Sequence, residues 1–353
     1  MVERALIVRL GAMGDVIHAL PVAAALRARY PGIVLGWVVE RRWSELLAAP
    51  GSASSVRCPQ KPAVDQLHFV DTRHWRRHLF TRRTFEEVRS LIRELRSSRY
   101  DLAIDVQGAI KSAVITRLSG ATTRLGFAEP REQVAARLYT QRVKAEGRHI
   151  VDQNLSLLRP IVDGAGVEGA GFVFPEDAEA ERWCTHELGR RGITGPFAIL
   201  NPGAGWGAKQ WPPERFGEVA QQLAERGIVP LVNYSPSEAA LALVVEQSSR
   251  GLAHRVACSI SQLVALTRRA RLFIGGDTGP MHLAAALKVP VVALFGPTDP
   301  VRNGPYGTKS IVLRSSSSMT SYSHTAHVDP GLLSISSADV VAAADQLLER
   351  SHG

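Results

Sequence analysis

The chain has 353 residues, 45% of them hydrophobic, which is enough for roughly two domains with buried cores. Its formal net charge of +9 favours an anionic partner such as nucleic acid, a nucleotide-sugar or an anionic lipid surface. The wide spacing of Cys58, Cys184 and Cys258 excludes a disulfide framework, which suits a reducing cytoplasm. No uncharged apolar run reaches the length of about 18 residues that spans a bilayer, so we expect a soluble or at most peripheral protein.

Strand and helix signals alternate along the first half of the chain. Apolar runs predict strands at 5–10, 33–39, 67–70 and 102–106, and helices at 16–30, 84–97 and 109–118. On the helix 84–97, Phe85, Val88, Ile92 and Leu95 recur near the 3.6-residue period and predict its buried face. This repeated βα pattern indicates a parallel sheet with helices on both faces.

A glycine-rich segment, 162–171, is the predicted linker, and the pattern restarts after it. Strands are predicted at 197–200, 228–232, 271–274 and 289–295, and helices at 213–226, 236–247, 260–268 and 336–349. We therefore expect an α/β protein with two Rossmann-like domains, at 1–172 and 173–332, whose parallel sheets face a central cleft. The C-terminal helix, 336–350, is expected to pack back on the N-terminal domain.

The first βα turn, Gly11-Ala12-Met13-Gly14-Asp15, ends in a carboxylate at the carboxyl end of a strand. There it can accept a proton from a hydroxyl nucleophile. Aspartate is also a preferred cap at the start of a helix, and this alternative is equally open. The spacing G-x-x-G-D differs from a dinucleotide fingerprint.

Two later loops have the composition of phosphate-binding loops. Between a predicted strand and a helix, 201–213 holds three glycines and Lys209, which suit a diphosphate. The segment Gly275-Gly276-Asp277-Thr278-Gly279-Pro280-Met281-His282 follows another strand and opens a helix, so Asp277, Thr278 and His282 are candidate contacts of a phosphorylated ligand. The alternatives are a solvated charge for Lys209, a helix cap for Asp277 and a packed ring for His282.

Five arginines and no acid lie between residues 73 and 83. Such a run is either a solvated face or an arm that binds an anion such as a phosphorylated lipid or nucleic acid. The low aromatic content of 6% and the lack of a recognition-helix or RNA-binding signature count against nucleic acid. No carboxylate cluster, D-x-D or H-E-x-x-H motif indicates a metal.

Taken together, these motifs resemble the ADP-heptose:lipopolysaccharide heptosyltransferases, which are inverting glycosyltransferases of the GT-B type. The resemblance spans nearly the whole chain and rests on ALIVRLGAMGDVIHALP, YDLAIDVQGAIKSAVI, NPGAGWGAKQWPPERF and GGDTGPMHLAAALKVPVVALFGPTDP, in this order. The segments WVVE and NGPYG resemble heptosyltransferase I, which adds the first heptose to the Kdo of the lipopolysaccharide inner core.

The resemblance implies a role for individual residues. It makes Asp15 the general base and Lys209 the contact of the donor phosphates. The implied donor-binding residues are Gly205, Lys209, Glu238, Cys258, Asp277, Thr278, Gly279 and His282. The implied acceptor-binding residues are Gly14, Lys111, Arg73, Arg76 and Arg77. Ala204, Gly205 and Gly207 stand where some relatives carry polar side chains, so we expect backbone N–H groups to bind the donor there.

The reaction that the resemblance implies is attack of a Kdo hydroxyl on the anomeric carbon of ADP-heptose, with release of ADP and no metal or other cofactor. The partners are then ADP-heptose, Kdo-lipid A and the cytoplasmic face of the inner membrane, without nucleic acid. Alternatives are heptosyltransferase II, another nucleotide-sugar-dependent GT-B transferase, a sugar-nucleotide epimerase, or a non-catalytic module that binds anionic polymers.

Overall fold

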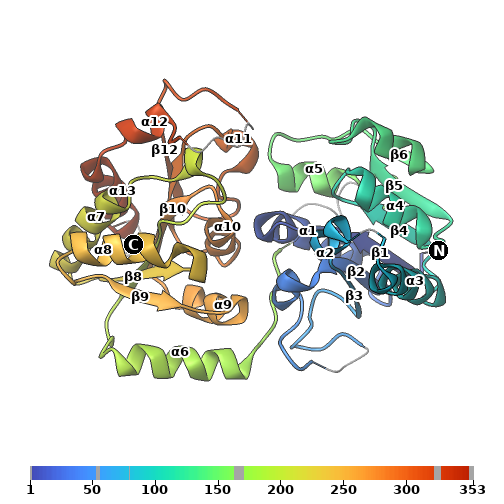
Figure 1. Cartoon of the computed structure of the whole chain (residues 1–353), viewed down its shortest axis with the longest axis horizontal. Coiled ribbons are helices and arrows are strands. Elements are labelled where there is room, and N and C mark those ends of the chain that lie inside the picture. Colours follow the sequence, from blue (N-terminus) through green and yellow to red (C-terminus); the bar gives the residue numbers. More distant parts are fainter. Residues whose placement is uncertain (1, 53–55, 79, 163–170, 322–326, 350–353) are drawn as a thin grey trace. The chain divides into compact units, whose positions relative to one another are not determined.

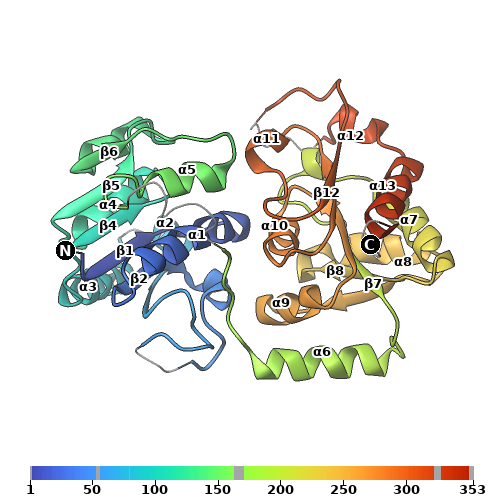
Figure 2. The same cartoon turned by 180° about the vertical axis from the view of Figure 1, so that it is seen from behind.

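The computed structural model describes residues 2–52, 56–78, 80–162, 171–321 and 327–349. The chain divides into two compact units, Met1–Glu176 and Asp177–Gly353, coloured blue to green and green to red in Figures 1 and 2. Most of the predicted linker, residues 163–170, lies outside the described residues.

The first unit is a six-stranded parallel sheet with the strand order β3-β2-β1-β4-β5-β6. Its strands are β1 (Arg4–Val8), β2 (Val34–Glu40), β3 (Gln66–Val70), β4 (Leu102–Asp105), β5 (Thr123–Phe127) and β6 (Gln141–Val143). Its helices are α1 (Met13–Arg29), η1 (Arg41–Leu46), α2 (Thr72–Arg77), α3 (Arg82–Ser97), α4 (Ile110–Leu118), η2 (Gln133–Leu138) and α5 (Ile150–Ser156). The strand order reverses between β1 and β4, which is where ligands bind in open sheets of this kind.

The second unit repeats this architecture with the order β12-β11-β10-β7-β8-β9. Its strands are β7 (Phe197–Asn201), β8 (Val229–Tyr234), β9 (His254–Ala257), β10 (Leu272–Gly276), β11 (Val291–Phe295) and β12 (Ser310–Arg314). Its helices are α6 (Ala178–Arg190), η4 (Gly207–Lys209), α7 (Pro213–Glu225), η5 (Pro236–Glu238), α8 (Ala239–Ser248), α9 (Ile260–Arg268), α10 (Gly279–Ala286), α11 (Pro300–Asn303), α12 (Pro330–Ser334) and α13 (Ser337–Glu349). The reversal here lies between β7 and β10.

The strands of both sheets are apolar, and helices cover the sheets on both faces. In the second unit one core cluster packs α7 and α13 on one face of the sheet, and another packs α6, α9 and α10 on the other face. Strands covered on both faces read as continuous apolar runs, as in Val291–Phe295, where all five residues are buried. The predicted α/β class is confirmed.

One expectation about helices is wrong, and a second fails at one residue. The C-terminal helix α13 belongs to the second unit, where Val340 and Leu347 pack into the core beside α7, instead of returning to the first unit. Phe85 of α3 is 66% exposed, whereas Leu91 and Leu95 are buried. The rest of the predicted face holds, since Leu95 is buried and Val88 and Ile92 are partly buried, but Thr84 and not Phe85 begins the buried stripe.

Along the described parts of the chain, no helix combines the length and the apolar character needed to cross a membrane.

Candidate functional site

Asp15 lies at the carboxyl end of β1, in the first turn of α1. The helix begins at Met13, earlier than predicted, so Asp15 is inside the helix rather than at the end of a loop. Its Oδ2 accepts the N–H of Ala12 at 2.9 Å, and its Oδ1 lies 2.6 Å from Nη2 of Arg9. The side chain is 43% exposed. The N-cap residue is Ala12, and Asp15, the third residue of the helix, accepts its N–H. Asp15 thus helps to cap the helix and still presents a carboxylate to solvent.

Polar side chains that end or follow β2, β3 and β4 lie near one another in the first unit. Glu40, buried at the end of β2, accepts a hydrogen bond from Thr72 Oγ1 at 2.5 Å and one from Arg42 Nε at 2.9 Å. Lys111, exposed in the first turn of α4, lies with its Nζ 3.5 Å from Thr72 Oγ1. Gly14 is buried in the first turn of α1. Lys111 is therefore part of a polar cluster with Glu40 and Thr72.

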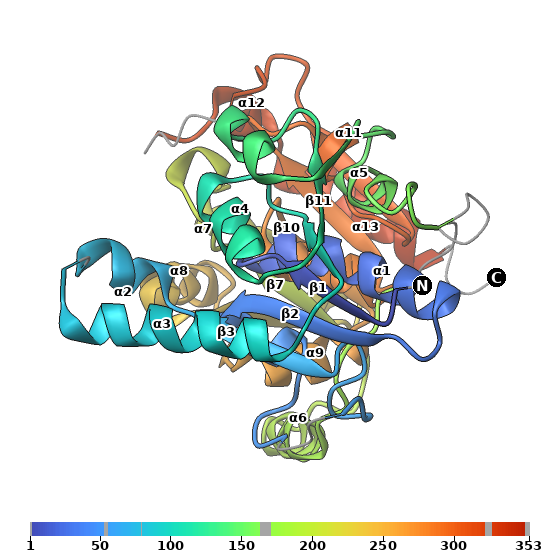
Figure 3. The same cartoon turned by 90° about the vertical axis from the view of Figure 1, so that its right-hand side faces the viewer.

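The arginine run divides into two groups. Arg82 and Arg83 form ion pairs with Glu86 and Glu87 along α3, each at 2.8 Å. Arg73, Arg76 and Arg77 lie exposed on α2, and no ion pair with a described residue is found for them. Trp75 of α2 donates to Glu87 of α3 at 2.8 Å, which ties the two helices together at the end of the unit seen at the left of Figure 3. Three positive charges on α2 thus remain available for an anion.

Lys209, Asp277 and His282 form one connected group in the second unit. Nζ of Lys209 lies 2.6 Å from Oδ2 of Asp277, and Nε2 of His282 lies 3.1 Å from Oδ1. The Lys209 ammonium also lies 5.0 Å from the centre of the Trp206 ring, a cation–π distance. Burial by itself would raise the pKa of Asp277, but the hydrogen bond with His282 and the charge of Lys209 outweigh it and hold that pKa well below its usual range. Asp277 is an ionised anchor for both neighbours.

Gly275 and Gly276 belong to β10, which extends two residues beyond the predicted strand at 271–274. A Cβ on Gly275 would lie 3.1 Å from the carbonyl oxygen of Asn201, and one on Gly276 would lie 3.2 Å from that of Lys209. Glycine therefore permits the close approach of the 201–209 loop to β10. Thr278 is the N-cap of α10, and Gly279 and Pro280 begin it. Pro280 has no N–H, so the N–H groups of Thr278 and Gly279 are the ones that can bind an anion at this helix start.

Glu238, Cys258 and Gly205 occupy loops at the ends of neighbouring strands. Oε2 of Glu238 accepts hydrogen bonds from the N–H and the hydroxyl of Ser235, at 2.8 Å and 2.7 Å, and a Cβ on Gly203 would collide with this carboxylate. Sγ of Cys258 lies 3.5 Å from Oδ1 of Asn233. Gly205 is exposed, with open space where a side chain would point.

Sequence reasoning missed the residues that support these loops. Nδ2 of Asn233 donates to Oδ1 of Asn201 at 2.7 Å, and Nδ2 of Asn201 donates to the carbonyl oxygen of Gly203 at 3.0 Å. Both asparagines are buried at strand ends. The sequence signal that could have identified them is a polar residue at the end of an otherwise apolar strand. The same signal marks Glu40 and Arg9 in the first unit.

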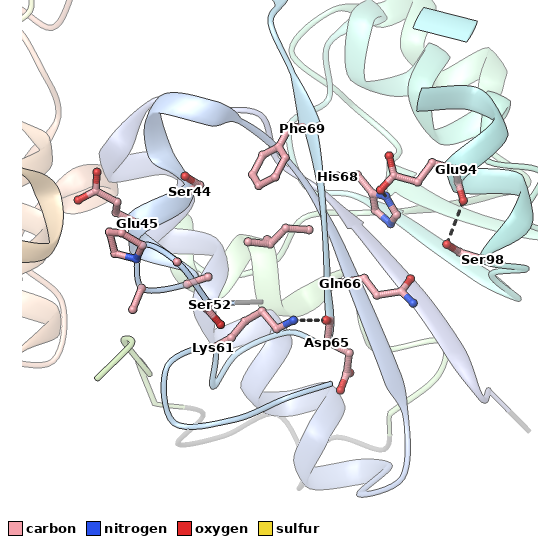
Figure 4. A pocket seen from close by; sticks show the side chains of 15 residues that line it. Ser44, Glu45, Ser52, Lys61, Asp65, Gln66, His68, Phe69, Glu94 and Ser98 are labelled. Atoms are coloured by element: carbon pink, nitrogen blue, oxygen red, sulfur yellow. Dashed lines mark hydrogen bonds and ion pairs between the residues drawn. The ribbon is translucent and has the colours of Figure 1, made fainter. Parts of the chain in front are cut away.

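The structure thus groups the predicted residues by unit. Asp15, Gly14 and Lys111 lie at strand ends of the first sheet, and Arg73, Arg76 and Arg77 follow β3. The predicted donor residues gather at the strand ends of the second sheet. A pocket of 540 Å³ between β3, α3 and the loop after η1 contains none of the predicted residues, and its Lys61 is engaged by the carbonyl oxygen of Asp65 (Figure 4). Within the described residues, no cluster of three His, Cys, Asp or Glu side chains suited to a metal was found.

Comparison with known proteins identifies the family. The sequence model of the family described as Glycosyltransferase family 9 (heptosyltransferase) matches residues 88–329. The chain belongs to glycosyltransferase family 9. It is 31% identical to lipopolysaccharide heptosyltransferase 1 of Pseudomonas aeruginosa over 88% of this chain and 84% of that protein. It is 26% identical to lipopolysaccharide heptosyltransferase 3 of Escherichia coli over 85% of this chain and 84% of that protein.

Solved structures of family 9 members have the same fold. A glycosyl transferase family 9 protein from Veillonella parvula aligns with a TM-score of 0.82 at 22% identity, covering 99% of this chain and 98% of that one. E. coli heptosyltransferase WaaC with ADP-2-deoxy-2-fluoro heptose aligns with a TM-score of 0.71 at 25% identity, covering 99% of both chains. The family 9 chain is a glycosyltransferase of the GT-B fold class, as the resemblance implied.

Proposed function

We propose that this family 9 glycosyltransferase transfers heptose from ADP-heptose to the Kdo of the lipopolysaccharide inner core, with inversion, as heptosyltransferase I does. The observation that carries the proposal is the group formed by Lys209, Asp277 and the start of α10 at the point where the second sheet reverses its strand order. A cation beside free backbone N–H groups suits a sugar diphosphate. The likeness to heptosyltransferase 1 relatives supports heptose as the sugar.

In this proposal Asp15 is the general base. The acceptor hydroxyl gives its proton to the Asp15 carboxylate as its oxygen bonds to the anomeric carbon, and ADP leaves from the opposite face. The exposure of the carboxylate supports this role, because a base must reach the hydroxyl directly.

Donor binding is assigned to the second unit. Lys209 and the N–H groups at Thr278 and Gly279 stabilise the charge that develops on the departing diphosphate, so the reaction requires neither a general acid nor a metal. Asp277 holds Lys209 and His282, and both Asp277 and His282 face the sugar. Glu238 binds the ribose, and Cys258 lies on the adenine side. Gly205 contributes backbone N–H groups rather than a side chain.

Acceptor binding is assigned to the first unit. Gly14 lets the acceptor approach the first turn of α1, and Lys111 binds the Kdo carboxylate. Arg73, Arg76 and Arg77 contact phosphates of the lipid acceptor at the cytoplasmic face of the inner membrane. The unpaired charges of α2 support this assignment, since an anionic lipid surface attracts exposed arginines by about 1 kcal/mol each.

One assay tests the donor, the acceptor and the subtype together. The protein is incubated with ADP-heptose and an acceptor that bears either bare Kdo or Kdo already carrying one heptose, and products are followed by mass spectrometry. We expect product with bare Kdo only. Product with the second acceptor alone would replace the proposal by heptosyltransferase II, and conversion of ADP-heptose without any acceptor would favour an epimerase. Asp15→Asn is the control, expected to retain ADP binding and to transfer heptose only at a residual rate that single-turnover assays can still measure.

A further inference from the structure

Arg9 lies directly after β1 and is the buried partner of Asp15. Its side chain is 10% exposed, against 43% for Asp15. Nη2 lies 2.6 Å from Oδ1 of Asp15, and Nη1 donates to the carbonyl oxygen of Val106 at 2.8 Å. A single guanidinium thus joins the carboxylate to the end of β4, the neighbouring strand at the point of order reversal.

The Asp15 carboxylate is oriented from both sides. Oδ1 is held by Arg9, and Oδ2 by the N–H of Ala12 at 2.9 Å. Because a carboxylate oxygen has two acceptor positions, each of these contacts leaves one position open for a substrate hydroxyl. The planar, forked guanidinium can bind two acceptors in fixed directions, which an ammonium group cannot do.

The end of β4, where Val106 accepts the hydrogen bond from Arg9, is itself fixed by hydrogen bonds. Asp105, fully buried, accepts the N–H groups of Gln107 and Gly108 at 2.8 Å and 3.0 Å. Oε1 of Gln107 accepts the N–H of Leu10 at 3.1 Å, next to the turn that leads to Asp15. The carbonyl group that receives Arg9 is therefore part of a fixed frame rather than of a free loop.

We propose that Arg9 is a positioning residue that fixes the direction of the Asp15 carboxylate for proton transfer. This inference rests on the proposed role of Asp15 as the base. During the reaction the proton passes from the acceptor hydroxyl to Asp15, the new glycosidic bond forms as the bond to the diphosphate breaks, and Arg9 remains charged throughout. Since Arg9 reaches the reaction only through Asp15, its loss lowers kcat and leaves the KM for the donor unchanged.

The test is a double-mutant cycle with Arg9→Met and Arg9→Lys, each in the native chain and in the Asp15→Asn variant, measured as single-turnover transfer. In the native chain we expect Arg9→Met to lower kcat about 100-fold, since a small misplacement of a catalytic group has an effect of this order. Arg9→Lys should lower kcat about tenfold, because one ammonium group cannot hold both partners in the original geometry. In the Asp15→Asn variant neither substitution should have a further effect.

Arg4→Met is the matched control, because Arg4 begins the same strand at its opposite end, where its Nε donates to the carbonyl oxygen of Ser98. It should leave kcat unchanged. Equal losses from Arg9 substitution in both backgrounds, or a native kcat in the Arg9→Lys variant, would overturn the positioning role. If Arg9→Met does not fold, Arg9→Lys completes the cycle. Native turnover by Asp15→Asn alone would instead refute the proposed function.

Discussion

Asp277 shows how one buried carboxylate can organise several predicted ligand contacts. It holds Lys209 through Oδ2 and His282 through Oδ1, and it is itself only 7% exposed. Lys209 is therefore neither a solvated loop charge nor a free cation. Its ammonium group is held between a carboxylate and the indole ring of Trp206, so it has a fixed direction before any diphosphate binds.

Substituting Lys209 should affect activity and stability by separable routes. We expect Lys209→Met to slow transfer about 10²–10³-fold, the usual cost of losing one preorganised charge contact. It should also destabilise the protein by about 3 kcal/mol, because Asp277 loses a buried partner. Transfer assays and denaturant unfolding measure the two effects. The double variant Lys209→Met/Asp277→Asn should regain stability but not activity, and recovery of activity in it would contradict the assignment.

At the scale of elements, the loops after β7 and β8 pack closely because Gly203 of the first loop leaves room for Glu238 of the second. The carboxylate of Glu238 lies where a side chain on Gly203 would be, 2.0 Å from the position of an added Cβ, and Ser235 holds it there. Asn201 and Asn233 fix the strand ends beneath. The placement of Glu238 is therefore a property of two loops and not of its own turn alone.

Gly203→Ala should displace Glu238 without unfolding the second unit, because the colliding atoms are the end of a flexible side chain. We expect the KM for ADP-heptose to rise about tenfold, as for loss of one hydrogen bond to a charged group. The matched control is Gly195→Ala just before β7, where an added Cβ likewise meets open space and donor KM should be unchanged. Steady-state kinetics measure both, and equal KM values for the two variants would argue against a donor contact by Glu238.

At the scale of the whole molecule, the two units have the same strand order but different electrostatic designs. Among the predicted site residues, the first has exposed arginines on α2 and a partly exposed carboxylate at Asp15, whereas the second has the buried Lys209–Asp277 pair. The contacts of Asp277 with His282 and Lys209 make the second arrangement sensitive to acid, because they depress the pKa of Asp277 only while the unit is folded.

The second unit should lose stability in acid through Asp277. Below the pKa of about 3.9 that an aspartate has in unfolded chains, the unfolded state binds a proton that folded Asp277 does not bind. Stability from this group is therefore complete above about pH 4 and falls as pH drops toward the folded pKa. Hydrogen exchange of peptides from β10 and α10, measured between pH 5 and pH 3, follows this loss. Asp277→Asn should show a shallower dependence on pH, and an unchanged dependence would refute the prediction.

The sequence by itself determined the fold class, because apolar runs separated by helical periods leave few options other than parallel sheets covered on both faces. It also located the loops that carry Asp15, Lys209 and Asp277, since glycines and polar residues at strand ends mark ligand-binding edges. The beginning of α1 at Met13 was not predicted, although a local contact, the N–H of Ala12 with the Asp15 carboxylate, caps it. The inclusion of Gly275 and Gly276 in β10 was not predicted because it depends on pairing with β7 and β11.

Only the tertiary structure decided which side chains support those loops and where the last helix packs. Arg9 and Asp15 are six residues apart, but Val106, the other partner of Arg9, is 97 residues away. Lys209 and Asp277 are separated by 68 residues, and α13 meets α7 across more than a hundred. Local patterns record helical and strand periods, whereas such pairings exist only after the strands have assembled, and for this reason they could be found only in the folded protein.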